Sequence, residues 1–130
     1  MIAVRPLPFP AVVVGRGRLG RALASALGEA DFPPSVVGGR EGAAEPEKVI
    51  RAVRGAGPAA VLLLAVRDDA LAGLAERLAV AVPPLPPGTA VLHFSGVLGC
   101  EILAPLSATG LPAGTCHPLQ TFTGSPGDAA

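Results

Sequence analysis

Short apolar runs alternate with longer amphipathic segments along almost the whole chain, and this alternation strongly limits the folds that the chain can adopt. The runs are "AVVVG" from Ala11, "SVVGG" from Ser35, "AAVLLLAV" from Ala59, "TAVLHF" from Thr89 and "GTCHP" from Gly114. Each run is rich in apolar or β-branched residues and is bounded by Gly or Pro. This pattern predicts strands that are buried on both faces of a sheet.

The segments between these runs have the period of amphipathic helices. After the first run, apolar residues recur on one helical face, at Leu19, Ala22, Leu23, Ala26 and Leu27, and Gly28 can end that helix. Residues 46–57 repeat the pattern more weakly, and a shorter helix is expected over 99–110, where Pro105 disturbs its end. Residues 68–82 place three Leu side chains on one face behind an N-cap at Asp68 or Asp69, namely Leu71, Leu74 and Leu78.

Alternation of strand and helix implies right-handed βαβ units, in which parallel strands are joined by helical crossovers. We therefore expect an α/β fold with a doubly wound parallel sheet of about five strands, in the order 2-1-3-4-5, and helices on both faces. A chain of 130 residues fits one such domain. Because 50% of the residues are hydrophobic but only 3% are aromatic, the core must consist mostly of Ala, Val and Leu.

The charge balance excludes several classes of partner. Ten basic residues offset ten acidic ones, so no broad cationic field exists to attract nucleic acid or a membrane surface. The N-terminus "MIAVRPLPFP" lacks the apolar centre of a signal peptide, and we expect a soluble, cytoplasmic protein. Cys100 and Cys116 are too few for a disulfide framework and lack the spacing of a metal site, so no metal is expected.

A glycine pattern lies where the first expected strand meets the first expected helix. It reads Gly15-Arg16-Gly17-Arg18-Leu19-Gly20, the G-x-G-x-x-G fingerprint of dinucleotide binding in this context. Gly15 permits the tight turn, Gly17 lets the backbone approach a pyrophosphate, and Gly20 lets the helix pack against the strand. The alternative to a dinucleotide-binding loop is an ordinary α/β turn, in a degenerate domain that binds no ligand in its cleft.

The end of the second run distinguishes between nucleotides. NAD-binding units usually carry an acidic residue there, whereas this chain has Gly39 and Arg40. A guanidinium can pair bidentately with the 2′-phosphate of NADP(H), which we therefore predict as the cofactor. Arg16, Arg18 or Arg21 can add a second contact. In the alternative interpretation Arg40 is a solvated loop residue paired with Glu41; FAD and S-adenosylmethionine sites also use Gly-rich turns but account for Arg40 less simply.

Polar residues follow the last three runs, and the carboxyl ends of parallel strands form the ligand-binding edge. They are Arg67, Asp68, Asp69, His93, Ser95, Gly96, His117, Pro118 and Gln120. His is well suited to proton transfer near neutral pH, so His117 is the candidate acid/base, with Ser95 and Gln120 positioning substrate. The competing interpretations make His93 a core histidine, and Asp68 or Asp69 a helix cap.

With these residues in place, the chain resembles a Rossmann-like oxidoreductase/dehydrogenase family within the 6-phosphogluconate dehydrogenase-like superfamily. The resemblance is carried by "VVVGRGRLGRALASAL", "VVGGR", "LLLAVRDDAL", "HFSGVLGCEILAPL" and "GTCHPLQTF". Ketopantoate reductase, pyrroline-5-carboxylate reductase and prephenate dehydrogenase belong to this superfamily. The resemblance implies a nicotinamide cofactor, usually NADP, over the glycine loop. The residues expected beside its ribose and nicotinamide are Ala65, Val66, Arg67, Asp68, Ser95 and Gly96.

The same resemblance carries further expectations. The His-Pro pair of prephenate dehydrogenases, whose His contacts substrate, falls on His117 and Pro118. Residues 1–124 correspond to the dinucleotide-binding domain, and 125–130 resemble the start of a linker to a C-terminal helical domain that this chain lacks. We therefore expect the NADP(H)-binding domain of an oxidoreductase acting on a carbonyl or imine of a small metabolite. The alternative is a non-catalytic NADP(H)-binding or sensing module, and a homodimer is a further assembly that the resemblance allows.

Overall fold

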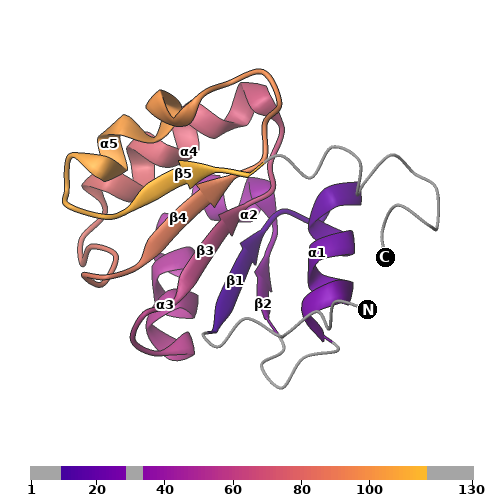
Figure 1. Cartoon of the computed structure of the whole chain (residues 1–130). Helices are drawn as coiled ribbons and strands as arrows, with labels where there is room; N and C mark the ends of the chain where they lie inside the picture. Colours follow the sequence, from indigo (N-terminus) through magenta and orange to yellow (C-terminus); the bar gives the residue numbers. More distant parts are fainter. Residues whose placement is uncertain (1–9, 29–33, 117–130) are drawn as a thin grey trace, which may run out of the picture.

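The computed structural model describes residues 10–28 and 34–116, which form one five-stranded parallel sheet with helices around it (Figure 1). The strands are β1 (Ala11–Val14), β2 (Ser35–Val37), β3 (Val61–Leu64), β4 (Ala90–His93) and β5 (Ala113–Thr115). Their order is β2-β1-β3-β4-β5, so the predicted fold class and the predicted strand order are confirmed.

The register of the sheet brings the carboxyl ends of all five strands to one level. Val14 lies opposite Val37 on one side and Leu64 on the other. Leu64 in turn lies opposite His93, and His93 lies opposite Thr115. The residues that directly follow these strands therefore lie side by side along one edge of the sheet.

The helices divide unequally between the two faces of the sheet. They are α1 (Arg18–Gly28), α2 (Gly39–Ala44), α3 (Pro46–Ala56), α4 (Asp68–Val80), the 3-10 helix η1 (Cys100–Leu103) and α5 (Ala104–Ser107). The chain adds β2 on one side of β1 and then adds β3, β4 and β5 in turn on the other side. Because crossovers between parallel strands are right-handed, α1 lies on one face and the other helices lie on the opposite face (Figure 1).

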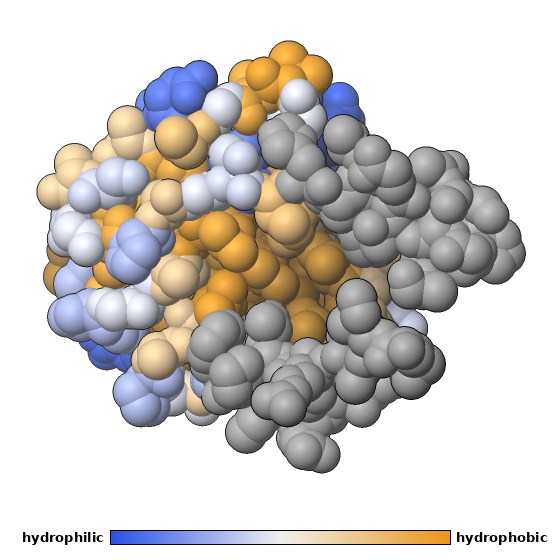
Figure 2. All heavy atoms as spheres, in the orientation of Figure 1, coloured by the Kyte–Doolittle hydropathy of each residue, from blue (hydrophilic) through white to orange (hydrophobic). Residues whose placement is uncertain are grey.

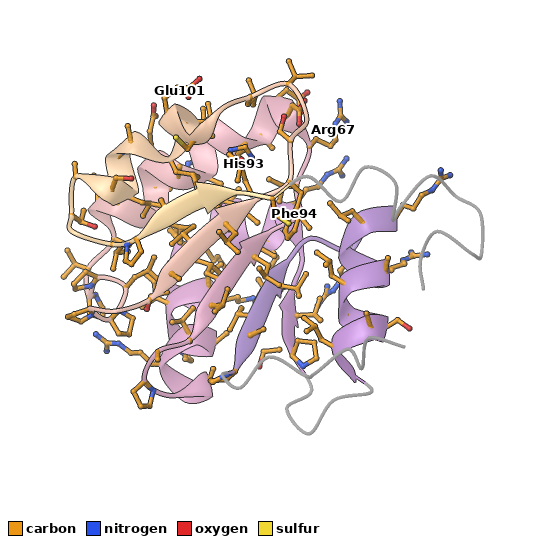
Figure 3. All side chains as sticks on the ribbon, viewed as in Figure 1. Arg67, His93, Phe94 and Glu101 are labelled. Atoms are coloured by element: carbon orange, nitrogen blue, oxygen red, sulfur yellow. The ribbon has the colours of Figure 1, made fainter. Side chains whose placement is uncertain are left out.

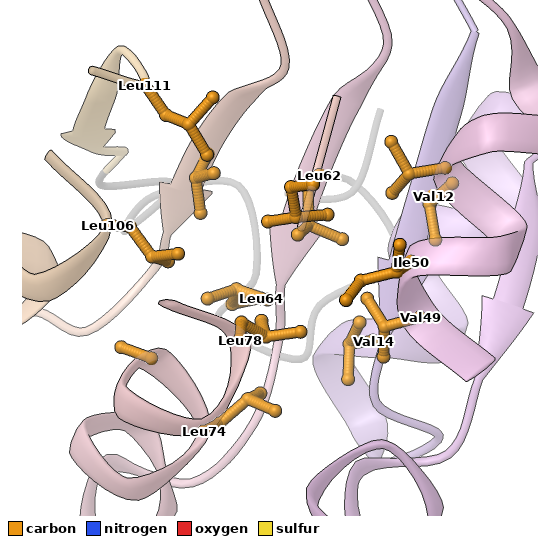
Figure 4. Packing of buried hydrophobic residues seen from close by; sticks show 14 of the residues in the cluster. Val12, Val14, Val49, Ile50, Leu62, Leu64, Leu74, Leu78, Leu106 and Leu111 are labelled. Atoms are coloured by element: carbon orange, nitrogen blue, oxygen red, sulfur yellow. The ribbon is translucent and has the colours of Figure 1, made fainter. Parts of the chain in front are cut away.

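The main core lies between the sheet and the helices α3, α4 and α5, which cover one of its faces (Figure 4). Val12 and Leu62 point into it from the central strands, and Ile50, Leu78 and Leu106 meet them from these helices. All five side chains are almost fully buried. The core thus consists of Val, Leu, Ile and Ala, as the composition predicts.

The opposite face is only partly covered. Val13 and Leu63 are buried there, but α1 is the one described helix on this side, and Leu23 and Leu27 of that helix are only partly buried. Figure 2 shows apolar side chains gathered in a hollow at the centre of this face. Burial on both faces is therefore correct for β1 and β3 and wrong for the other three strands, because β2 and β5 are sheet edges and no described helix spans this side of β4.

Several boundaries differ from the sequence prediction. The helix α2 was not predicted, since its six residues "GREGAA" are too few to show a period. The strand β5 begins one residue earlier than expected, at Ala113. The N-cap of α4 is Arg67, and Asp68 and Asp69 lie in the first turn instead, where carboxylates interact favourably with the helix dipole. None of the helices in residues 10–28 and 34–116 is long and apolar enough to cross a bilayer.

Candidate functional site

Two glycines of the G-x-G-x-x-G loop are required by the fold itself. Gly15 has φ +131°, and a Cβ atom there would overlap the carbonyl group of Ala65 at the end of β3. A Cβ atom at Gly20 would overlap the carbonyl group of Gly15, so the first turn of α1 packs directly on the loop. The roles predicted for these two glycines, a tight turn and close helix packing, agree with these contacts.

Gly17 is different, because the fold does not require a glycine there. A Cβ atom at this position would have no neighbour within 4 Å, and the residue is exposed. The space above Gly17 is therefore open, as expected where a backbone admits a ligand closely. A hollow of about 240 Å³ lies beside the loop and is lined by Gly15, Arg16, Gly20, Arg21, Ala24 and Val36.

The start of α1 presents unpaired backbone donors to this space. The N–H of Arg21 donates to the carbonyl oxygen of Gly17 at 2.9 Å, which is the first bond of the helix. The three preceding N–H groups have no acceptor within the helix, and the helix dipole makes this end partially positive. The loop is fixed on its other side because the N–H of Gly15 donates to the carbonyl oxygen of Val37 at 2.8 Å. The arrangement fits a phosphate or pyrophosphate group.

Arg40 lies beyond the end of β2, in the first turn of α2. Its side chain is exposed and forms no ion pair with any residue of the described ranges. The pairing of Arg40 with Glu41 is therefore not seen, while the exposure of Arg40 agrees with the other part of the alternative interpretation, a solvated residue. Arg16 approaches the same region from the glycine loop, and its Nη1 lies 3.3 Å from the position that a Cβ atom of Gly38 would take. Two guanidinium groups thus belong to this side of the site.

A carboxylate also lies at the end of β2, which sequence reasoning missed. Glu41 turns back so that its Oε1 accepts the N–H of Gly38 at 3.4 Å, as in one half of a capping box. Its Oε2 accepts a hydrogen bond from Lys48 Nζ at 3.0 Å, and Arg16 Nη2 lies 3.8 Å from Oε1. The short helix α2 brings Glu41 back to the strand end. The spacing of three residues between Gly38 and Glu41, which is the spacing of a capping box, could have indicated this contact in the sequence.

The charges around Glu41 shift two pKa values. The hydrogen bond from Lys48 lowers the pKa of the Glu41 carboxyl below its ordinary range, and the N–H of Gly38 and the charge of Arg16 act in the same direction. The pKa of Lys48 is raised by its hydrogen bonds to Glu41 and Glu45. Both groups are therefore charged at neutral pH, and Glu41 is neutralised mainly by Lys48.

His93 is fully buried, and both of its ring nitrogens have partners. The N–H of Ser95 donates to Nδ1 at 3.1 Å, so Nδ1 carries no proton. Nε2 then carries the proton and donates to the carbonyl oxygen of Gly99 at 2.9 Å. This tautomer, assigned from the hydrogen-bond pattern, leaves the imidazole neutral with no free nitrogen. The contacts favour the interpretation of His93 as a core histidine.

Ser95 organises the loop that follows β4. Its hydroxyl oxygen accepts the N–H groups of Val97 at 3.2 Å and Leu98 at 2.9 Å, and the residue is buried. Gly96 beside it is exposed. Ser95 thus has a defined structural role at the expected edge, and its catalytic role stays a prediction.

The loop after β3 adjoins both the glycine loop and α2. Ala65 faces Gly15, and Val66 Cγ1 lies 3.2 Å from the position that a Cβ atom of Gly39 would take. Arg67 is exposed and forms an ion pair of 3.1 Å with Asp69, while Asp68 is exposed beside them. The structure therefore brings the residues predicted for the cofactor site to one edge of the sheet.

Phe94 lies at the same edge and was not singled out from the sequence. It directly follows β4, is partly buried against the half-open sheet face, and lies on the same side of the molecule as Arg67 and His93 (Figure 3). The chain has no Trp or Tyr, and Phe94 is the one Phe in residues 10–28 and 34–116. An aromatic residue at the carboxyl end of a strand was the available signal.

Other predicted residues lie outside the described ranges. These are His117, Pro118 and Gln120, together with residues 117–124 of the expected domain and the expected linker 125–130. The role of His117 as acid/base therefore stays a prediction. Among the residues that the structure describes, no group of three His, Cys, Asp or Glu side chains could hold a metal ion.

A larger hollow, of about 340 Å³, lies away from this edge. It is formed by the end of α4 and the segments that precede β4 and β5, and no charged side chain lines it: Leu78, Ala79, Pro84, Leu85, Pro87, Gly88, Leu106, Thr109, Gly110 and Leu111. The one hydroxyl among them, that of Thr109, already donates to the carbonyl oxygen of Leu106 at 2.6 Å. Size alone therefore does not locate the functional site, and the anion-binding geometry lies at the carboxyl edge.

Comparison with known proteins agrees with the observed fold. The family model described as a Rossmann-like domain matches residues 3–118, which is most of the chain. No curated protein matches the chain. The matched family is consistent with nucleotide binding at the edge where the glycine loop lies. On its sheet order, its glycine loop and this match, the chain belongs to the Rossmann-like domain family.

Proposed function

We propose that this domain binds NADP(H) as the cofactor-binding part of a cytoplasmic oxidoreductase, which acts on a carbonyl or imine of a small metabolite. The observation that carries the proposal is the position of Gly17, which has open space where a side chain would stand and directly precedes the first turn of α1. Gly15 and Gly20 are explained by contacts within the protein, whereas Gly17 is not. A ligand that must approach the backbone accounts for a glycine at this position.

The chain's own groups suit the two phosphate positions of such a cofactor. The N–H groups at the start of α1 would hold the pyrophosphate, and Arg16 and Arg40 would hold the 2′-phosphate. A charge-assisted hydrogen bond contributes about 1.5 to 3 kcal/mol, which corresponds to about a ten- to hundredfold preference for the phosphorylated cofactor. The paired state of Glu41 supports this choice, because a carboxylate neutralised by Lys48 opposes a phosphate less than a free one.

Catalysis would combine the cofactor with groups at the same edge. A bound nicotinamide ring supplies or accepts the hydride. His117 would donate or accept the proton at the substrate oxygen or nitrogen, and Gln120 and Ser95 would orient the substrate. Phe94, which directly follows β4 and packs on the apolar sheet face, would keep water from the reacting atoms.

The alternative function is a binding or sensing module without turnover, and one observation favours it. Both nitrogens of His93 and the hydroxyl oxygen of Ser95 are engaged in the loop after β4. Within the described ranges, the β4 end therefore offers no free imidazole for proton transfer. A turnover assay with carbonyl and imine substrates distinguishes the two functions, because only the enzyme oxidises NADPH.

The proposal is tested by titrating the chain with NADPH and NADH in a calorimeter, in parallel with a Gly17→Ala variant. We expect Gly17→Ala to fold normally, because its methyl group meets no protein atom, but to bind NADPH at least tenfold more weakly. Gly73→Ala is the matched control: Gly73 is exposed within α4, also has no neighbour within 4 Å, and lies outside the site, so binding should be unchanged.

An Arg40→Ala variant tests the cofactor preference separately. We expect NADPH affinity to fall toward the NADH value while NADH affinity is unchanged. Equal NADPH affinity in Gly17→Ala and in the unmodified chain would contradict the assignment of the glycine loop. No binding of either dinucleotide to the unmodified chain would refute the proposed function.

A further inference from the structure

We infer that the Glu41–Lys48 ion pair sets the cofactor selectivity of this site, with Lys48 as the residue that turns a strand end suited to NAD into one suited to NADP(H). The inference rests on the proposed function and adds a positioning residue to it. Lys48 lies in the first turn of α3 and would act through Glu41, whereas Arg16 and Arg40 would contact the phosphate.

Glu41 occupies the place that decides selectivity in this fold. Gly38 is the first residue after β2, and NAD-binding domains hold a carboxylate at this strand end to accept the ribose hydroxyl groups. The Glu41 carboxylate reaches the N–H of Gly38 at 3.4 Å. Without a counter-ion, it would offer an acceptor to a ribose hydroxyl and repel a 2′-phosphate.

Lys48 supplies that counter-ion at short range. Its Nζ lies 3.0 Å from Oε2 of Glu41 and 3.3 Å from Oε1 of Glu45, so one ammonium group serves both carboxylates. The contact from Arg16 to Glu41 is longer, at 3.8 Å, and the Arg16 side chain is 62% exposed. Within the part of the chain that the structure describes, most of the hydrogen-bond donors of Arg16 therefore have no partner and can bind an external anion.

The charge count around the end of β2 supports the same conclusion. The ion-pair network contains two cations, Arg16 and Lys48, and two anions, Glu41 and Glu45. Arg40 of α2 adds a cation outside the network, which gives these five groups a net charge of about +1. Loss of Lys48 would bring the sum to about zero and leave Glu41 with the longer contact to Arg16 as its ion pair within the described ranges. This loss of net positive charge predicts weaker binding of the 2′-phosphate and therefore a change in cofactor preference.

The ion pair joins two helices that pack tightly against each other, so its two residues have fixed relative positions. A Cβ atom at Gly42 of α2 would lie 3.0 Å from the side chain of Val49, so α2 and α3 pack in close contact. Val49 and Ile50 are buried in the main core, directly after Lys48. The backbone that carries Lys48 therefore has a fixed position relative to Glu41.

The test is a double-mutant cycle of Lys48→Met, Glu41→Gln and the double variant, titrated with NADPH and NADH. We expect Lys48→Met to weaken NADPH binding about tenfold and to leave NADH binding unchanged or tighter, since it removes a nearby positive charge and frees Glu41. In the double variant NADPH binding should recover to within about threefold of the unmodified chain, because removing the charge of Glu41 as well restores the net charge of these groups to about +1.

Arg54→Met is the matched control for loss of a cation from α3. Arg54 is exposed in the last turn of the same helix, so its removal should change neither affinity. Thermal unfolding of each variant checks that the fold is retained. Titration with 2′-AMP and 5′-AMP should reproduce the effect of Lys48→Met for 2′-AMP only.

The outcomes separate this inference from the proposed function. Equal losses for NADPH and NADH in Lys48→Met, or no recovery in the double variant, would overturn the selectivity role while leaving cofactor binding intact. A preference of the unmodified chain for NADH would overturn it as well. Absence of binding to either dinucleotide by the unmodified chain would instead refute the proposed function on which it rests.

Discussion

At the residue scale, the same amino-acid type has different causes at different positions. Gly15 and Gly20 are fixed by neighbouring carbonyl groups, while Gly17 has open space where a side chain would stand. His93 lies among the predicted polar residues of the carboxyl edge, but it is buried with both nitrogens paired. A sequence pattern can indicate which residues are candidates for a site, but the role of each residue depends on its contacts in the folded structure.

His93 provides a prediction at this scale. We expect His93→Leu to lower the free energy of unfolding by about 2 to 4 kcal/mol, because it leaves the N–H of Ser95 and the carbonyl of Gly99 without their partner. Urea unfolding followed by circular dichroism measures this loss. A variant of unchanged stability that loses turnover would indicate a catalytic histidine instead.

At the element scale, α2 shows how a short unpredicted helix can reorganise a site. It turns Glu41 back to the end of β2, and Arg77 of α4 holds its other end by donating to the carbonyl oxygen of Ala43 at 2.7 Å. The ion pair of Glu41 with Lys48 then joins α2 to α3. The chemistry of the strand end therefore depends on helix packing as well as on the residues that directly follow β2.

This ion pair predicts a pH dependence of stability. The pKa of Glu41 is lowered from its ordinary value of 4.5 by Lys48, so its contribution is present above that pH and is lost as the pH falls through the lowered value. The stability difference between the unmodified chain and Glu41→Gln should therefore be constant near neutral pH and shrink below pH 4.5. Thermal melts across this range measure it; a difference that grows on acidification would contradict the ion pair.

At the scale of the whole molecule, the two faces of the sheet differ in cover. Leu62 is fully buried under α3 and α4, whereas Leu92 is only partly buried on the face that carries α1. We expect Leu62→Ala to cost about 3 to 4 kcal/mol of unfolding free energy and Leu92→Ala about 1 to 2 kcal/mol, since cavity and transfer terms scale with burial. Denaturant unfolding of both variants provides the comparison, and equal costs would mean that both faces are equally covered.

The sequence by itself determined the sheet, the strand order and the glycine loop, because these depend on local patterns. Apolar runs bounded by Gly and Pro, helical periods between them and single crossovers leave few topologies for a chain of this length. The register of the strands then brings their ends together without further information.

The tertiary structure alone decided which side chains meet at those ends. It paired Glu41 with Lys48, seven residues further along the chain and on the next helix, and used both nitrogens of His93 in a loop that the sequence left open. It also left one face of β4 without a described helix, although its residues "AVLH" resemble those of a fully buried strand. Ion pairs, tautomers and burial depend on distances between separate elements, and no local pattern of residues contains those distances.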